Sequence, residues 1–228
     1  MRTAAVAVDE VAPSAGRAAG LNFGTEHSNS CRMTPTIRTC SSGQPGRPRA
    51  FDEDAAIAAA LALFWRRGYE ATSLEALTAA MGLSRSSFYC CFGSKRGALT
   101  AALDAYARDS LARLAEVAGT ASAPREAALA MLDALTRRGD GAQGCLMLNC
   151  ATELAPHDPE IAELTQAHIL KIAGLIETQL AQTGAPDPRA TALALTALAS
   201  GVILMRKAGV PDEAVQAALA SAAPLIPG

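Results

Sequence analysis

Apolar residues recur at the spacing of amphipathic α-helices through most of the chain beyond residue 50. In the predicted helix that ends at Arg67 they fall at Ile57, Leu61, Phe64 and Trp65, which lie on one helical face. The remaining long helices are predicted over residues 94–118, 124–138, 158–183, 189–207 and 212–222. This pattern predicts an all-α fold.

Residues 72–95 are predicted to form two short helices joined by a tight turn. Thr72 and Glu75 have the spacing of a capping box at the start of the first helix. Gly82 is expected to end that helix, and Ser84 to cap a second helix that ends near Cys91. Two helices with a short glycine-containing turn have the geometry of a DNA-binding helix-turn-helix, whose second helix enters the major groove.

The charges of this region also favour a nucleic-acid partner. The formal net charge is −2, but basic residues collect before residue 97, and the part after Asp104 is acidic. Lys95 and Arg96 follow the predicted cap Ser94, where the helix macrodipole disfavours cations. A DNA phosphate bound at that helix terminus would remove the conflict. The basic arm at residues 46–49 is held extended by proline, which suits a narrow minor groove.

The stretch from residue 46 to 106 resembles the DNA-binding domain of the TetR family of one-component transcriptional regulators. The matching segments are GRPRAFD, ALFWRRGYEATSL and AMGLSRSSFYCCFGSKRGAL, and their most specific part is the run Phe88, Tyr89, Phe92 and Lys95. We expect an N-terminal three-helix helix-turn-helix domain at 46–96 and a C-terminal helical ligand-binding and dimerisation domain at 97–228. Residues 1–45 are rich in small and polar residues and are expected to be a disordered extension, within which Met33 is an alternative start.

Nine residues are predicted to contact DNA. Those at the exposed start of the second helix are placed to read bases, and arginine there is the commonest partner of guanine. The resemblance assigns Tyr89 and Lys95 to phosphates and Phe88 and Phe92 to the core. The full predicted set is Arg47, Arg49, Thr72, Arg85, Ser86, Ser87, Tyr89, Lys95 and Arg96.

Composition limits the cellular setting. No apolar run reaches the roughly 20 residues of a membrane span, and the first residues lack a signal-peptide pattern, so we expect a soluble cytoplasmic protein with no membrane partner. The six cysteines are irregularly spaced without a CxxC pair, which is typical of reduced thiols rather than of a disulfide scaffold.

The segment GCLMLNCATELAPHDP, residues 144–159, is the most chemically suggestive part of the second half. It resembles the regulatory domain of a TetR subgroup in which some members respond to electrophiles, oxidants or copper through a cysteine here. Cys145 and Cys150 lie some 140° apart around a helix, so they do not share a face. The candidate ligand or sensor residues are Cys145, Met147, Cys150, His157 and His168, and a metal set of Cys145, Cys150 and His157 would need local rearrangement. Both thiols also fit an apolar core, and His168 also fits a hydrogen-bonded core position.

The leading interpretation is a homodimeric transcriptional repressor without cofactor or catalytic activity. Its expected partners are a palindromic DNA operator and a small-molecule or thiol-reactive inducer. A helical adaptor with a purely structural helix-turn-helix is the alternative, and a salt-dependent DNA shift would separate the two. An enzyme is disfavoured because the sequence has no phosphate loop, no HExxH and only three histidines.

Overall fold

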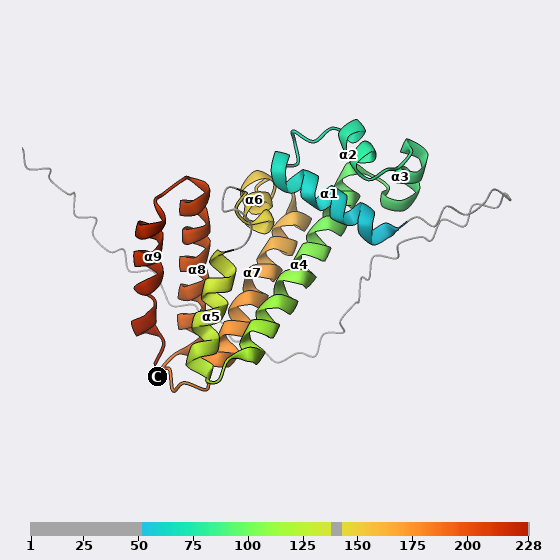
Figure 1. Ribbon diagram of the computed structural model, residues 1–228. Coiled ribbons are helices and arrows are strands. Elements are labelled where there is room, and N and C mark those ends of the chain that lie inside the picture. Colours follow the sequence, from blue (N-terminus) through green and yellow to red (C-terminus); the bar gives the residue numbers. More distant parts are fainter. Residues whose placement is uncertain (1–51, 138–142, 228) are drawn as a thin grey trace, which may run out of the picture. The chain divides into compact units, whose positions relative to one another are not determined.

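The computed structural model describes residues 52–137 and 143–227 (Figure 1). The predicted extension at 1–45 and the arm residues Arg47 and Arg49 lie outside the described residues. Within the described ranges the chain forms α-helices, one 3₁₀ turn and no strand, which confirms the all-α prediction. The α-helices are α1 (Glu53–Arg67), α2 (Leu74–Ala80), α3 (Arg85–Phe92), α4 (Lys95–Thr120), α5 (Pro124–Thr136), α6 (Leu146–Glu153), α7 (Pro159–Leu180), α8 (Pro188–Lys207) and α9 (Asp212–Ala220), and the 3₁₀ turn is Ala223–Leu225.

Side-chain caps begin the helices around the turn, mostly as predicted. Asp52 accepts a hydrogen bond from the Ala55 amide at 3.0 Å and starts α1. Ser84 and Ser94 cap α3 and α4 through their hydroxyl oxygens. Gly82 has φ +65°, the left-handed conformation predicted for the end of α2. The helix-turn-helix is therefore built by local backbone rules.

The start of α2 corrects the prediction. Ser73, not Thr72, is the cap, and its hydroxyl oxygen accepts from the Ala76 amide at 3.1 Å. Thr72 is wholly buried, and its hydroxyl donates to the Gly68 carbonyl at 2.7 Å. The packing of the α1–α2 turn directs Thr72 inward, so this residue does not belong to the DNA-contacting surface. A smaller correction concerns the end of α4, which was predicted at residue 118 and lies at Thr120.

Two hydrophobic clusters lie along α4, which runs from the helix-turn-helix into the helical body (Figure 1). Leu99 and Leu103 belong to the first cluster, together with residues of α1, α2 and α3. Leu114 belongs to the second, with residues of α5, α7 and α8. The first cluster also contains Met147 and Cys150 of α6. The core of the DNA-binding helices is therefore closed partly by α6, while the domain boundary at residues 96 and 97 stays a prediction.

Helix α8 is apolar on more faces than its own chain covers. By length and composition α8 is long and apolar enough to cross a membrane, since its most apolar stretch has a mean hydropathy of 1.4. Only 28% of that stretch is buried inside the protein. It nevertheless packs against α5, α7 and α9 as a helix of the bundle. Leu193 is 41% and Leu204 65% exposed. These leucines leave an apolar face that a second protein surface would cover.

Candidate nucleic-acid interface and regulatory cavity

The N-terminal turn of α3 presents a polar exposed surface. The Ser84 hydroxyl accepts from the Ser87 amide at 3.1 Å and lies 2.9 Å from the hydroxyls of both Ser86 and Ser87. Arg85 forms an exposed ion pair with Glu75 of α2. The pKa of Glu75 lies below its usual value because of a backbone hydrogen bond and the Arg85 charge. Exposed ion pairs of this kind contribute little to the stability of the fold. Arg85 can therefore exchange Glu75 for another hydrogen-bond acceptor with little loss of free energy.

The aromatic residues of α3 divide between core and surface as predicted. Phe88 is fully buried, and its ring centroid lies 5.6 Å from that of the half-buried Phe92. Tyr89 is 51% exposed. Phe88 thus fixes the rotation of α3, and this rotation leaves Arg85, Ser86 and Tyr89 outward. The contact of Tyr89 with a phosphate stays a prediction.

Lys95 is held by the α1–α2 turn. Its Nζ lies 4.2 Å from the centre of the Tyr69 ring and 3.5 Å from the Glu70 carbonyl oxygen, to which it donates. An ammonium over an aromatic face is weakly attracted and stays hydrated on its open side. Tyr69 therefore positions Lys95 at the edge of the helix-turn-helix, a role that the sequence pattern did not reveal.

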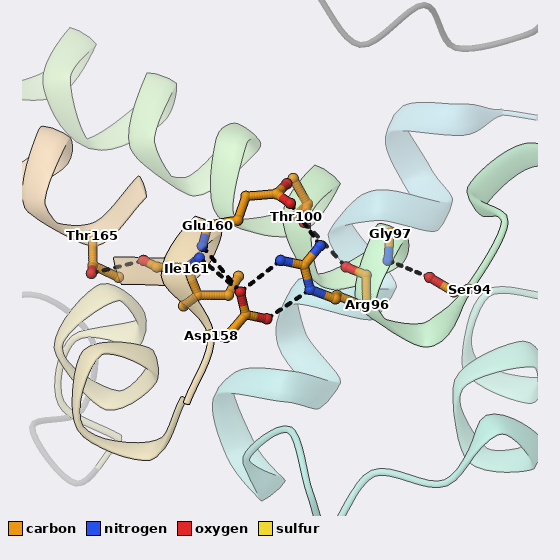
Figure 2. Close-up of polar contacts among 8 residues, drawn as sticks. All are labelled: Ser94, Arg96, Gly97, Thr100, Asp158, Glu160, Ile161 and Thr165. Carbon is orange, nitrogen blue, oxygen red and sulfur yellow. Dashed lines mark hydrogen bonds and ion pairs between the residues drawn. The ribbon is translucent and has the colours of Figure 1, made fainter. Parts of the chain in front are cut away.

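Arg96 corrects the prediction most clearly, because its side chain binds the body of the protein (Figure 2). Nη2 and Nε donate to the two carboxylate oxygens of Asp158 at 2.6 and 2.7 Å, and Nη1 donates to Glu160 at 2.8 Å. The same Asp158 caps α7 by accepting from the Ile161 amide at 3.2 Å. The Arg96 hydrogen bonds lower the pKa of Asp158 to about 2. Acidic groups of α7, rather than a phosphate, therefore balance the Arg96 charge.

The residue after Arg96 must be glycine in this arrangement. A Cβ atom at Gly97 would lie 2.0 Å from the Phe92 carbonyl oxygen, well inside van der Waals contact. The Gly97 amide donates to the Ser94 hydroxyl at 2.9 Å. The close junction of α3 and α4 thus explains why small Gly97 follows the two cations.

Helix α6 connects the body to the helix-turn-helix by hydrogen bonds at both of its ends. At its C-terminal end, Glu153 accepts from the amides of Tyr69 and Glu70 at 3.1 and 2.9 Å. Before its N-terminal end, the Gly144 carbonyl accepts from Trp65 Nε1 of α1 at 3.1 Å. Neither Glu153 nor Gly144 was predicted to bind α1 or its following turn, because their partners lie 79 to 84 residues away.

A cavity lies on the inner side of α6, among α4, α5, α7 and α8. Its free volume is about 50 Å³. Cys145 lies at its edge and accepts a hydrogen bond from the Tyr106 hydroxyl at 3.3 Å. The Tyr106 ring packs edge-on against Trp65 at 5.4 Å and against His168 at 6.2 Å. Three predicted sensor residues, Cys145, Met147 and His168, thus meet at one cavity.

The other two predicted sensor residues do not line this cavity. Cys150 is buried in the core of the DNA-binding helices, and burial raises the pKa of its thiol to about 12. A thiol of this kind stays protonated and is a poor nucleophile, which corrects the expectation for Cys150. His157 is exposed in the turn after α6. No cluster of three or more metal-ligating side chains occurs in the described parts of the chain, so Cys145, Cys150 and His157 do not form a preassembled metal site.

Comparison with known proteins identifies the family. Residues 56–103 match the family described as "Bacterial regulatory proteins, tetR family", which spans α1 to the first part of α4. The DNA-binding helices therefore match the TetR family, and the rest of the chain resembles that family in its helical fold. The proteins of this family are transcription regulators and not enzymes, in agreement with the sequence prediction.

Two curated TetR-family relatives come from Escherichia coli K12. The chain is 36% identical over 135 residues to the HTH-type transcriptional repressor ComR, in an alignment that covers 57% of this chain and 64% of ComR. It is 32% identical over 123 residues to the repressor BdcR, covering 53% of this chain and 61% of BdcR. The chain thus spans less than two thirds of the length of either relative.

Solved structures extend the likeness over the helical body. A cysteine mutant of the TetR-family regulator CifR, complexed with 26-bp double-strand operator DNA, matches with a TM-score of 0.71 and 29% identity, covering 80% of this chain and 100% of that chain. Reduced NemR from E. coli matches with a TM-score of 0.69 and 22% identity over 76% of this chain and 95% of NemR, a likeness of fold alone.

Proposed function

We propose that this protein is a transcriptional repressor that binds an operator in double-stranded DNA. The main support is the exposed first turn of α3, where Arg85, Ser86 and Ser87 face outward above the buried Phe88. This is the position from which a recognition helix reads base edges in the major groove. Tyr89 and Lys95 flank that turn and are assigned to phosphates.

The basic arm completes the proposed DNA surface. Arg47 and Arg49 lie outside the described residues, and we assign them to the minor groove beside the recognition site. Arg96 and Thr72 are left out of the proposed interface, since one is bound to α7 and the other is buried. The alternative function, a helical adaptor, leaves the outward set of Arg85, Ser86 and Ser87 without a role.

We further propose that the protein acts as a homodimer in the cytoplasm, on a palindromic operator. The exposed leucines Leu193 and Leu204 of α8 supply an apolar face of the kind that a second copy covers. A two-fold contact through α8 and α9 would separate the two recognition helices by about one turn of DNA, roughly 34–36 Å, or by a multiple of it.

The proposed signal is a small molecule or a thiol-reactive compound that enters the cavity at Cys145. Cys145 lines the cavity and lies directly before α6, whose other end holds Tyr69 and Glu70 through Glu153. A group added at Cys145 would displace the start of α6 and thereby the α1–α2 turn. Soft metals bind thiolates as well, so copper belongs to the same test.

The experiment has two stages. The purified protein is first tested for salt-dependent binding to fragments of promoter DNA, and unchanged weak binding to every fragment would favour the adaptor. Wild type and Cys145→Ser are then treated with quinones, aldehydes or copper while bound to the retained fragment. Release of the wild type alone is expected for a thiol signal, with Cys91→Ser as the control for another unoxidised thiol. Equal release of both proteins would assign Cys145 to the core.

A further inference from the structure

The cavity beside α6 has a cationic donor whose hydrogen-bonding capacity is not filled. Arg206, in the last turn of α8, lines the cavity and forms an ion pair from Nη1 to Asp212 at 3.1 Å. Its Nε is buried and has no hydrogen-bond partner among residues 52–137 and 143–227. A guanidinium has only donors, and a buried donor without an acceptor is costly. The Nε edge of Arg206 is therefore a place where a ligand acceptor would be stabilised.

The charged side chains around the cavity indicate the sign of the charge that a ligand would carry. The described residues that line it include two arginines, Arg113 and Arg206, and no aspartate or glutamate. The carboxylates paired with them, Asp109 and Asp212, are 66% and 68% exposed, so water screens their charge. The interior of the cavity thus favours an anion.

Three hydroxyl groups of the cavity wall, on Thr136, Thr196 and Ser200, are not available as donors to a ligand. Thr196 donates to the Ala192 carbonyl at 2.8 Å, and Ser200 donates to the Thr196 carbonyl at 2.9 Å. Thr136 likewise donates to carbonyls of its own helix at 3.0 and 3.1 Å. With their protons engaged by the helices, these hydroxyls present acceptors to the cavity. A carboxylate needs donors, which the guanidinium supplies.

We propose that the ligand of this cavity is a small organic carboxylate whose charged group binds the Nε edge of Arg206. The free volume of about 50 Å³ equals that of roughly three to five waters, which sets the size at that of a short-chain acid. Leu114, Ile172 and Ile203 line the apolar part and receive its hydrocarbon end. Nη1 keeps its ion pair with Asp212, while the opposite edge of the guanidinium, Nε and Nη2, donates to both carboxylate oxygens. This assignment rests on the proposed function only for its effect on DNA binding.

Trp65 provides the readout, since it is the only tryptophan of the chain. Its indole donates to Gly144, which lines the cavity, and packs against Tyr106, which lines it too. Tryptophan emission is titrated with propionate and butyrate, and with propionamide and butyramide as neutral isosteres, at constant ionic strength. The acids are expected to change the emission saturably and to bind about tenfold more tightly than the amides, because hydrogen bonds to charged groups are stronger.

Variants identify the binding group. Arg206→Met keeps an apolar stem and is expected to bind the acids about tenfold more weakly, with amide binding unchanged. Arg206→Lys, which keeps the charge, should retain part of the affinity and guards against a folding defect in the first variant. Arg189→Met, at the exposed start of the same helix, should behave as wild type. Equal affinities for acids and amides, absence of binding by the wild type, or unchanged acid affinity in Arg206→Met would each overturn the site.

The operator assay separates this site from the proposed function. A protein that binds butyrate through Arg206 but retains no promoter fragment would refute the repressor and leave the carboxylate site standing. A protein that retains its operator but ignores every acid would refute the carboxylate site alone. Release of the operator by butyrate from the wild type, and not from Arg206→Met, is the result expected if both are right.

Discussion

Replacing Glu153 by alanine tests whether α6 holds the DNA-binding helices in position. The wild-type carboxylate accepts two backbone hydrogen bonds, from Tyr69 at 3.1 Å and from Glu70 at 2.9 Å. Hydrogen bonds to charged groups contribute about 1.5–3 kcal/mol each when well buried. Both amides lie near solvent here, so we expect each hydrogen bond to contribute about 1 kcal/mol to the free energy of unfolding. The substitution should lower the free energy of unfolding by about 2 kcal/mol.

Denaturant unfolding at one fixed protein concentration measures this change, because the stability of a dimer depends on concentration. Thr152→Ala is the matched control, since the Thr152 hydroxyl donates only to carbonyls of its own helix. Glu153→Gln should fall between wild type and alanine, because an amide offers one acceptor oxygen in place of two. Identical unfolding curves for Glu153→Ala and Thr152→Ala would refute the proposed link.

The same variant should weaken operator binding without changing its salt dependence. Loss of Glu153 frees the α1–α2 turn, and with it Tyr69, but it removes no phosphate contact. Affinity should therefore fall by a similar factor on all operator sequences while the slope of log affinity against log salt stays constant. Fluorescence anisotropy at several salt concentrations gives both quantities, and a changed slope would place Glu153 near the DNA instead.

Other substitutions separate the roles of the remaining residues. Lys95→Ala should reduce the salt slope by about one unit, whereas Arg96→Met should leave it unchanged, and equal slopes for both variants would contradict the assignment of Lys95. Tyr89→Phe should weaken binding uniformly, and Arg85→Ala should relax base preference at one position of each half-site, as operator variants would reveal. Leu204→Glu should yield monomers by light scattering, and a wild type that is already monomeric at micromolar concentration would refute the proposed dimer.

The sequence alone determined the helix-turn-helix because its signals are local. The Ser84 and Ser94 caps each bond to an amide three residues ahead, and Gly82 ends α2 through its own φ angle. Phe88 and Tyr89 separate inside from outside by helical periodicity. All of these relationships join residues that lie within one or two helical turns of each other in the sequence.

Only the tertiary structure decided the partners of Arg96 and Glu153. Arg96 carries the same charge as Lys95 and stands beside it, yet its partner Asp158 lies 62 residues away on α7. Thr72 has the sequence spacing of a capping residue, yet its side chain is buried, and its neighbour Ser73 caps α2 instead. Periodicity specifies which face of a helix is apolar, but the charged side chains at its ends bind whatever the packing of distant helices brings within reach.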